Sequence, residues 1–176
     1  MTSSTSTIAD FYCAAGTDHR GRSFDDILRF DDAGLERGHD YIQWLFPTVT
    51  ASRFNPDAPT LDAATATRLR TDPTAQPRLR AALLRMLAFY GLELDDDDPT
   101  DPEIFECNDS SGRARHWLTP GNHNYSRLTR MLASLIVLDQ RPLALALYRC
   151  LERLYRTDYG AHIGDATLSH WRRQVD

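Results

Sequence analysis

A chain of 176 residues, with 41% hydrophobic and 26% charged residues, has the size and composition of one soluble domain with a sizeable core. Its formal net charge of −5 argues against a non-specific nucleic-acid-binding protein, which needs an excess of basic residues. All 20 basic residues are arginine, which indicates the coding bias of a GC-rich genome.

Cysteine usage and the N-terminal sequence point to a cytoplasmic protein. Cys13, Cys107 and Cys150 lie far apart and form no CxxC pair, as is typical of reduced thiols. The N-terminal MTSSTSTIADFY lacks the basic and apolar regions of a signal peptide. The longest apolar run, LALALY, is far shorter than the ~20 residues of a membrane span. We therefore expect a cytoplasmic chain without an integral membrane segment.

The first predicted elements are a flexible tail and two helices. Residues 1–9 are rich in Ser and Thr and are expected to form the tail, with the folded domain over residues 10–176. Ser23 and the acidic residues that follow it fit the first turn of a short capped helix. The segment DDAGLERGHDYIQWLFP predicts a helix that ends at Pro47, because four of its residues share one helical face: Leu35, His39, Ile42 and Phe46.

Two further helices are predicted in the middle of the chain. The Pro-rich residues 47–59 are expected to form an ordered loop, and Thr60 is expected to cap a helix through about Arg70. Pro73 then marks the start of an amphipathic segment that ends at Gly91, a typical C-cap residue. Four apolar residues share one face of this segment: Leu79, Leu83, Met86 and Tyr90.

The last part of the chain is predicted to contain one long loop and three helices. Residues 92–120 are polar and are expected to form a long loop. A helix over about 122–138 follows, with Asn122 or Asn124 as its N-cap, and Pro142 opens another long helix. A short helix, DATLSHWRR, comes last. Five to seven helices without a convincing hairpin predict an all-α, compact single-domain bundle with long ordered loops.

The stretch HDYIQWLFP has two interpretations. Aromatic side chains at helical spacing ordinarily belong to the core of a protein. Alternatively, Tyr41 and Trp44 line a ligand pocket, with Gln43 as a polar group and His39 titrating nearby. The spacing favours burial for most of the stretch.

The segment RARHWLTPGNHNYSRLTR gathers polar side chains at the start of a predicted helix. A helix N-terminus offers free N–H groups and a partial positive charge to an anion. Two arginines three residues apart can also present guanidinium groups to a carboxylate or phosphate. The alternative is an elaborate N-cap, with the arginines paired to the acidic loop. The candidate binding residues of this segment are His116, Asn122, His123, Asn124, Arg127 and Arg130.

No motif for a metal, a cofactor or a catalytic centre is found in the sequence. The Cys and His spacings match no zinc motif, and the acidic run at residues 95–98 lacks the Gly and Glu of a calcium loop. The GxSxG, P-loop and GxGxxG patterns are absent. We therefore expect no cofactor and no metal. An enzyme is unsupported, and His116 or His123 acting as acid–base on a phosphorylated or carboxylated substrate is the alternative.

Several sequence blocks also carry a family resemblance. HDYIQWLFP is followed about eight residues later by NPDAP, then by LRMLAFYGLEL (84–94), NHNYSRLTRMLASLIVL (122–138) and PLALALYRCLERL. With the N-terminal DFYCAAG, these blocks resemble, in order, the conserved region of the opioid growth factor receptor family. The resemblance covers roughly residues 10–172.

This resemblance implies a receptor-type role. The vertebrate receptor is a perinuclear and nuclear protein that binds met-enkephalin and is unrelated to the seven-helix opioid receptors. It carries long extra segments and C-terminal repeats, so this lysine-free chain resembles a bacterial single-domain relative. We therefore expect a non-enzymatic domain that binds a small peptide or an anionic small molecule. Arg127 and the 122–124 turn would hold the negative group, and Tyr41 and Trp44 the apolar part.

A protein-interaction scaffold is the other alternative to ligand binding. No nucleic-acid partner is expected, and no feature of the sequence specifies an oligomeric state.

Overall fold

The all-α class is confirmed by the structure, a computed structural model that describes residues 7–52, 55, 58–107, 112 and 116–176. These described residues form ten helices and one two-stranded sheet. Five of the helices have nine residues or more: α5 (Ala63–Thr71), α6 (Ala75–Tyr90), α8 (Asn124–Val137), α9 (Arg141–Tyr155) and α11 (Asp165–Val175). The short helices are α1 (Ile8–Cys13), α2 (Phe24–Leu28), α3 (Asp32–Arg37), α4 (Ile42–Leu45) and α10 (Gly160–Ile163).

The chain divides into two compact units, Met1–Ala82 and Leu83–Asp176. Helix α6 contributes its residues through Ala82 to the first unit and the remainder to the second. The expected boundary between a tail at residues 1–9 and a domain at 10–176 stays a prediction. Helix α1 begins at Ile8, which is buried. No helix in the described part of the chain is both long and apolar enough to cross a membrane.

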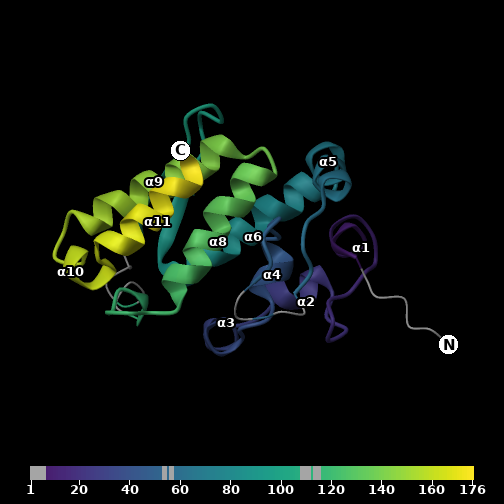
Figure 1. Ribbon diagram of the computed structural model, residues 1–176, viewed down its shortest axis with the longest axis horizontal. Coiled ribbons are helices and arrows are strands. Elements are labelled where there is room, and N and C mark those ends of the chain that lie inside the picture. The colour runs from purple at the N-terminus through teal and green to yellow at the C-terminus, as the bar shows by residue number, and fades with distance from the viewer. Residues whose placement is uncertain (1–6, 53–54, 56–57, 108–111, 113–115) are drawn as a thin grey trace. The chain divides into compact units, whose positions relative to one another are not determined.

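The first unit contains several short helices around an aromatic core, and α1, α2 and α3 have side-chain N-caps. Thr7 caps α1 and Ser23 caps α2, each in a capping box with the aspartate three residues later, and the predicted role of Ser23 is thus confirmed. Helix α1 packs on α5 (Figure 1). Its Phe11 ring lies 5.5 Å from Phe24 and 5.2 Å from Trp44 between centroids. Other fully buried side chains of this unit are Tyr12, Ile27, Leu35, Tyr41, Leu45, Phe46 and Leu69.

The helix predicted to run through residues 35–46 is interrupted, and this prediction was wrong in its middle part. Helix α3 ends at Arg37, and Gly38 adopts an extended conformation with ψ of 127°. Glycine favours such a break because it loses more conformational freedom in a helix than other residues. The Tyr41 hydroxyl then donates a 3.0 Å hydrogen bond to the Leu35 carbonyl, which folds the chain back before α4. Helix α4 ends before Pro47, as expected.

The cap of α5 also differs from the prediction. Asp62, and not Thr60, is its N-cap, because the Asp62 carboxylate accepts a 2.7 Å hydrogen bond from the Thr65 amide. Both Asp and Thr occur at N-caps, with Asp preferred, so the sequence contains two candidates only two residues apart.

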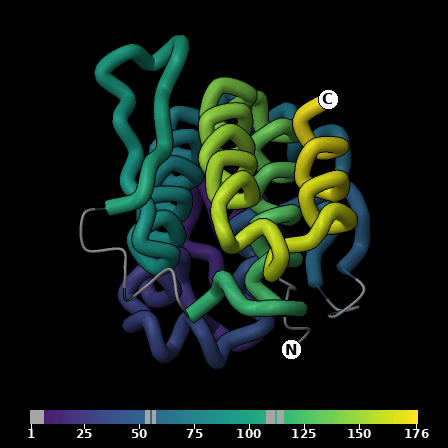
Figure 2. The backbone as a smooth tube through the Cα atoms, turned by 90° about the vertical axis from the view of Figure 1, so that its left-hand side faces the viewer, coloured from purple at the N-terminus to yellow at the C-terminus, as the bar shows by residue number. Residues whose placement is uncertain are grey.

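The second unit is a layer of helices with a hairpin beside it. Helices α8, α9 and α11 pack against one another in pairs, and α9 also contacts β2 (Figures 1 and 2). The predicted spacing of α8 is confirmed, since the four apolar residues that define it, the last of them at the C-cap, are buried: Leu128, Met131, Leu135 and Leu138. Helix α9 begins with Pro142 in its first turn, as expected.

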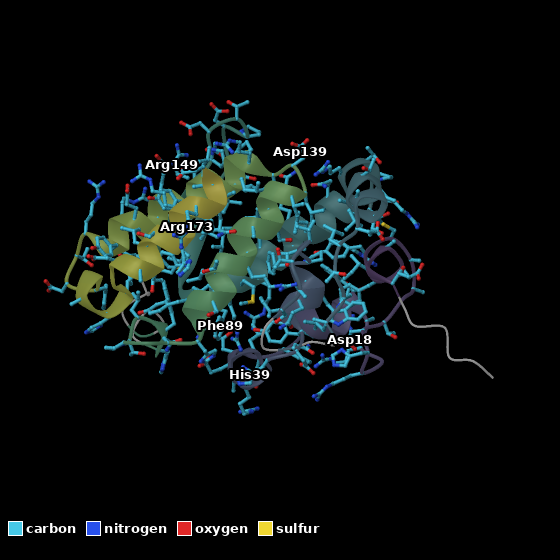
Figure 3. All side chains as sticks on the ribbon, viewed as in Figure 1. Asp18, His39, Phe89, Asp139, Arg149 and Arg173 are labelled. Atoms are coloured by element: carbon cyan, nitrogen blue, oxygen red, sulfur yellow. The ribbon has the colours of Figure 1, made fainter. Side chains whose placement is uncertain are left out.

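The expected loop at 92–120 contains a hairpin, and the prediction of a polar interval without strands was wrong. Strand β1 (Leu92–Asp95) pairs antiparallel with β2 (Glu103–Glu106), with Leu94 opposite Ile104. The acidic turn between them projects beyond the helices (Figure 2). Arg149 of α9, labelled in Figure 3, donates to the Pro102 carbonyl, and Arg153 donates to the Ile104 carbonyl. Residues 108–111 and 113–115 of the expected loop lie outside the described residues.

Candidate functional site

The turn before α8 is held in place by aromatic side chains of the second unit. The Trp117 indole donates a 3.1 Å hydrogen bond to the Tyr90 carbonyl at the end of α6. The Tyr125 hydroxyl donates to the Thr119 carbonyl over 2.9 Å. The Trp171 indole, from α11, donates to the Tyr125 carbonyl over 3.2 Å. Burial of these large rings and the pairing of their polar atoms fix the turn against three helices.

Asn122 organises this turn from within. Its amide nitrogen donates to the His116 carbonyl at 3.2 Å and to the Thr119 hydroxyl at 3.0 Å, while its side-chain oxygen accepts from the Asn124 amide at 2.9 Å. The amides of Tyr125 and Ser126 bond to the carbonyls of residues 122 and 123. These first-turn amides are therefore satisfied by the turn itself, as the N-cap interpretation expects.

Asn124 connects α6 to the first arginine of α8. It is fully buried, and its side-chain oxygen accepts a 3.0 Å hydrogen bond from Arg127 Nη1 and a 3.3 Å hydrogen bond from the Tyr90 hydroxyl. Arg127 is itself only 5% exposed. Because Asn124 is a neutral acceptor, it orients the guanidinium without neutralising its charge.

Arg130 lies one helical turn after Arg127, on the same side of α8. Desolvation lowers the pKa of Arg130 to about 10. The cation still predominates at neutral pH, but it is held where water screens it poorly. A carboxylate or phosphate that reached this part of α8 would therefore interact with its charge more strongly than with a surface arginine.

The two histidines of the predicted site lie on its outside. His116 and His123 are exposed. The predicted N-cap of α8, Asn122 or Asn124, was wrong, because His123 occupies that position without a side-chain capping hydrogen bond. A third histidine, which the sequence did not single out, contacts the same turn: His162 Nδ1 of α10 lies 2.8 Å from the Leu118 carbonyl. An acid–base role for His116 or His123 stays a prediction. No group of three potential metal-binding side chains occurs among the residues that the structure describes.

Tyr41 and Trp44 belong to the first unit, whereas the other six candidate residues belong to the second. Tyr41 is fully buried and Trp44 is 3% exposed. The Trp44 indole donates a 3.2 Å hydrogen bond to His19 Nδ1, and Gln43 donates to the His39 carbonyl over 3.3 Å. Both rings are thus core residues in this structure, as the interpretation favoured by the spacing expects.

The family of the chain follows from a comparison with known proteins. Residues 18–160 match the family model described as "Opioid growth factor receptor (OGFr) conserved region". This match covers well over half of the chain. The chain belongs to this family. All eight candidate site residues lie within the matched opioid growth factor receptor conserved region, whereas Trp171 lies beyond it.

Curated relatives carry the same family name. The opioid growth factor receptor-like protein 1 of Xenopus tropicalis is 34% identical over 118 residues, which are 65% of this chain and 22% of that protein. The opioid growth factor receptors of Mus musculus and Homo sapiens are each 34% identical over 57% of this chain and over 15% and 14% of their own lengths. The chain thus spans less than a quarter of these relatives. No solved structure matches it. A bacterial source and a cytoplasmic location stay predictions.

Part of the site could not be predicted from the sequence, because its contacts join residues that are far apart along the chain. Tyr90 and Trp117 lie 5.2 Å apart between ring centroids, and Tyr125 and Trp171 lie 5.8 Å apart. Trp117 and Tyr125 stood in the segment that the sequence singled out, whereas Tyr90 carried only the signal of apolar helical spacing and Trp171 stood in the short helix predicted last. In this opioid growth factor receptor region, the polar turn before α8 therefore packs against aromatic side chains from distant parts of the chain.

Proposed function

We propose that this chain is a non-enzymatic ligand-binding domain whose ligand is a small peptide or an anionic small molecule. The observation that carries the proposal is the family match over residues 18–160, whose curated relatives are named opioid growth factor receptors. Because the chain spans less than a quarter of those proteins, the proposal places the binding role in the shared region.

The α8 turn is the part of the chain best suited to hold a negatively charged group. Arg127 is oriented by Asn124, and Arg130 carries a poorly hydrated charge on the same side of the helix. The exposed His116 and His123 border the turn in sequence. Asn122 acts through the backbone that it holds, because its side chain already bonds within the turn. Tyr41 and Trp44 contribute by shaping the first unit from its core.

The test compares a peptide acid with its amide. Met-enkephalin and its C-terminal amide are each titrated into the protein while the midpoint of thermal unfolding is followed, since a ligand that binds only the folded state stabilises it. The acid should raise the midpoint more than the amide. This difference should vanish in Arg130→Gln, and it should persist in Arg156→Gln. Arg156 is the matched control because its side chain is 71% exposed and forms an ordinary surface ion pair with Glu152.

One result would restrict the proposal to one of its two ligand classes, and another would refute the proposed site. If neither peptide alters the midpoint while phosphate or acetate does, the ligand is an anion and not an opioid peptide. If no peptide or anion distinguishes the wild-type protein from Arg130→Gln, the α8 turn is not the binding site.

A further inference from the structure

In the first unit, a histidine links the buried Trp44 to a cluster of ion pairs. His19 Nδ1 lies 3.2 Å from the Trp44 indole nitrogen, and His19 Nε2 lies 3.5 Å from Asp40 Oδ2. The two ring planes are nearly parallel, at 15°, with centroids 6.3 Å apart. The His19 side chain is 37% exposed, whereas Trp44 is almost completely buried. His19 is therefore the point at which solvent protons reach the hydrogen bond of the indole.

The partners of His19 determine where its proton sits. An indole N–H only donates, so His19 Nδ1 must accept and carries no proton. A neutral imidazole has one N–H, which is then on Nε2 and faces the Asp40 carboxylate. A second proton can be added only at Nδ1, where it would place two N–H donors against each other. The Trp44 hydrogen bond and the charged form of His19 are mutually exclusive in this arrangement.

The charged groups around His19 are already balanced without it. Arg22 Nη2 bridges two carboxylates, at 2.5 Å from Asp18 Oδ2 and 3.1 Å from Asp40 Oδ1. Arg20 also contacts Asp40 through its Nε atom. Two arginines thus match two aspartates, and a protonated His19 would add a third cation. Helix α1 places the uncharged Phe11 ring against Trp44. Asp40 is flanked along the chain by the exposed His39 and by the buried Tyr41.

The backbone of this loop is held independently of His19. Asp18 Oδ1 accepts the amides of Arg20 and Arg22, both at 2.9 Å, and the Asp18 amide donates to the Arg22 carbonyl over 2.8 Å. Thr17 and Ser23 also pair as an isolated β-bridge. Asp18 and His39 are labelled in Figure 3. The loop can therefore keep its course while the His19 ring turns away.

We propose that His19 is a proton-sensitive latch on Trp44. In the neutral form of His19 the latch is closed, with Nδ1 accepting a hydrogen bond from the indole N–H. Protonation at Nδ1 converts this acceptor into a donor, breaks the hydrogen bond and turns the ring outward, so that the indole N–H becomes accessible to water or to a partner's acceptor. Because Trp44 stands in the HDYIQWLFP block inside the matched family region, acid opens this block locally and leaves the loop backbone in place.

The three tryptophans of the chain provide their own controls. The indoles of Trp117 and Trp171 donate to backbone carbonyls, which do not titrate, whereas Trp44 donates to a histidine. In a proton–nitrogen NMR titration from about pH 8 to about pH 5, across the usual range of histidine, only the Trp44 indole signal should move in a sigmoidal curve. The hydrogen exchange of this indole N–H with water, corrected for the effect of pH on intrinsic exchange, should accelerate about tenfold, because one net hydrogen bond is lost. Trp44→Phe assigns the signal.

Two variants and one further measurement make the proposal refutable. In His19→Gln, whose side-chain oxygen can accept a hydrogen bond from the indole N–H without titrating, the Trp44 signal should be independent of pH. In His39→Gln the sigmoidal shift should remain. The latch is overturned if the shift persists in His19→Gln, or if all three indole signals move together as in global unfolding. Should His19→Gln fail to fold, nitrogen spectra of the wild-type imidazole decide, because a neutral His19 with its proton on Nδ1 contradicts the proposal.

Discussion

Replacement of Asn124 tests whether the α8 turn depends on one buried amide. In Asn124→Ala, Arg127 loses the acceptor that lies 3.0 Å from its Nη1 atom, and the Tyr90 hydroxyl loses an acceptor at 3.3 Å. A hydrogen bond to a charged group contributes about 1.5–3 kcal/mol, and the longer neutral bond about 0.5–1 kcal/mol. We therefore expect the free energy of unfolding to fall by about 2–4 kcal/mol, a large share of the ~5–15 kcal/mol typical of a domain.

Urea denaturation followed by circular dichroism measures this loss. Tyr90→Phe removes only the weaker bond and should cost less than about 1 kcal/mol, while Ser126→Ala, an exposed position in the same turn, should be nearly neutral. The double variant of residues 90 and 124 should lose less than the sum of the two single losses, because the two side chains share a bond. A loss below about 1 kcal/mol in Asn124→Ala would refute the view that this amide holds the turn.

Three further predictions concern other parts of the chain. Glu103→Arg should stabilise the protein by about 0.5 kcal/mol in urea denaturation, because Glu103 faces Asp95 across the hairpin; Glu93→Arg, which faces Phe105, should have little effect. Arg78→Met should lower the free energy of unfolding by about 2–3 kcal/mol, because Arg78 donates to the carbonyls of Phe11 and Tyr12 at the end of α1; an unchanged urea midpoint would contradict this. Hydrogen bonds from the Ser23 side chain and backbone lower the pKa of Asp26. The Asp26 carboxylate therefore contributes fully to folding stability above the usual carboxyl pKa of about 3.9, and this contribution is lost as pH falls through the lowered value. Ser23→Ala should therefore flatten the acid limb of a plot of urea midpoint against pH, and an unaltered limb would rule out this capping box as its source.

The fold was predictable wherever its signals are local. The α8 spacing of Leu128, Met131 and Leu135 and the capping box at Ser23 depend on residues within one or two helical turns. The hairpin was missed because each strand has only four residues, and because its anchors on α9 lie 47 and 49 residues away along the chain. The break between α3 and α4 was missed because the apolar spacing continues across Gly38, while the Tyr41 hydroxyl that folds the chain back carries no sequence signal.

The sequence singled out the polar residues of the α8 turn but not the contacts that they make. Asn122 and Asn124 stood out as polar residues at a helix start, yet the same pattern fits a cap and a ligand contact. The Asn122 side chain forms its hydrogen bonds within the turn. The Asn124 side chain instead accepts hydrogen bonds from Arg127 and from Tyr90, which lies 34 residues earlier. Periodicity cannot supply such a pairing, because it depends on where α6 ends relative to α8.

A single substitution separates the structural role of the Asn124 side chain from an electrostatic one. Asn124→Asp keeps an acceptor oxygen for Arg127 and Tyr90 but adds a negative charge next to the guanidinium. The hydrogen bonds that Asn124→Ala removes would be retained, so stability at neutral pH should stay near the wild-type value. The Arg127 guanidinium should lower the pKa of the new carboxyl, and the stabilisation from this ion pair should be lost as pH falls through that lowered pKa.

Anion binding, unlike stability, should change markedly in Asn124→Asp. The new carboxylate would compete with a ligand's carboxylate for Arg127, so the preference for a peptide acid over its amide should fall about tenfold or more, which corresponds to about 1.4 kcal/mol. Competition titrations with the two peptides measure this preference. If Asn124→Asp is stable and still prefers the acid as strongly as the wild-type protein does, Arg127 orders the turn and holds no ligand, since a cation next to a full negative charge could not bind an anion undiminished.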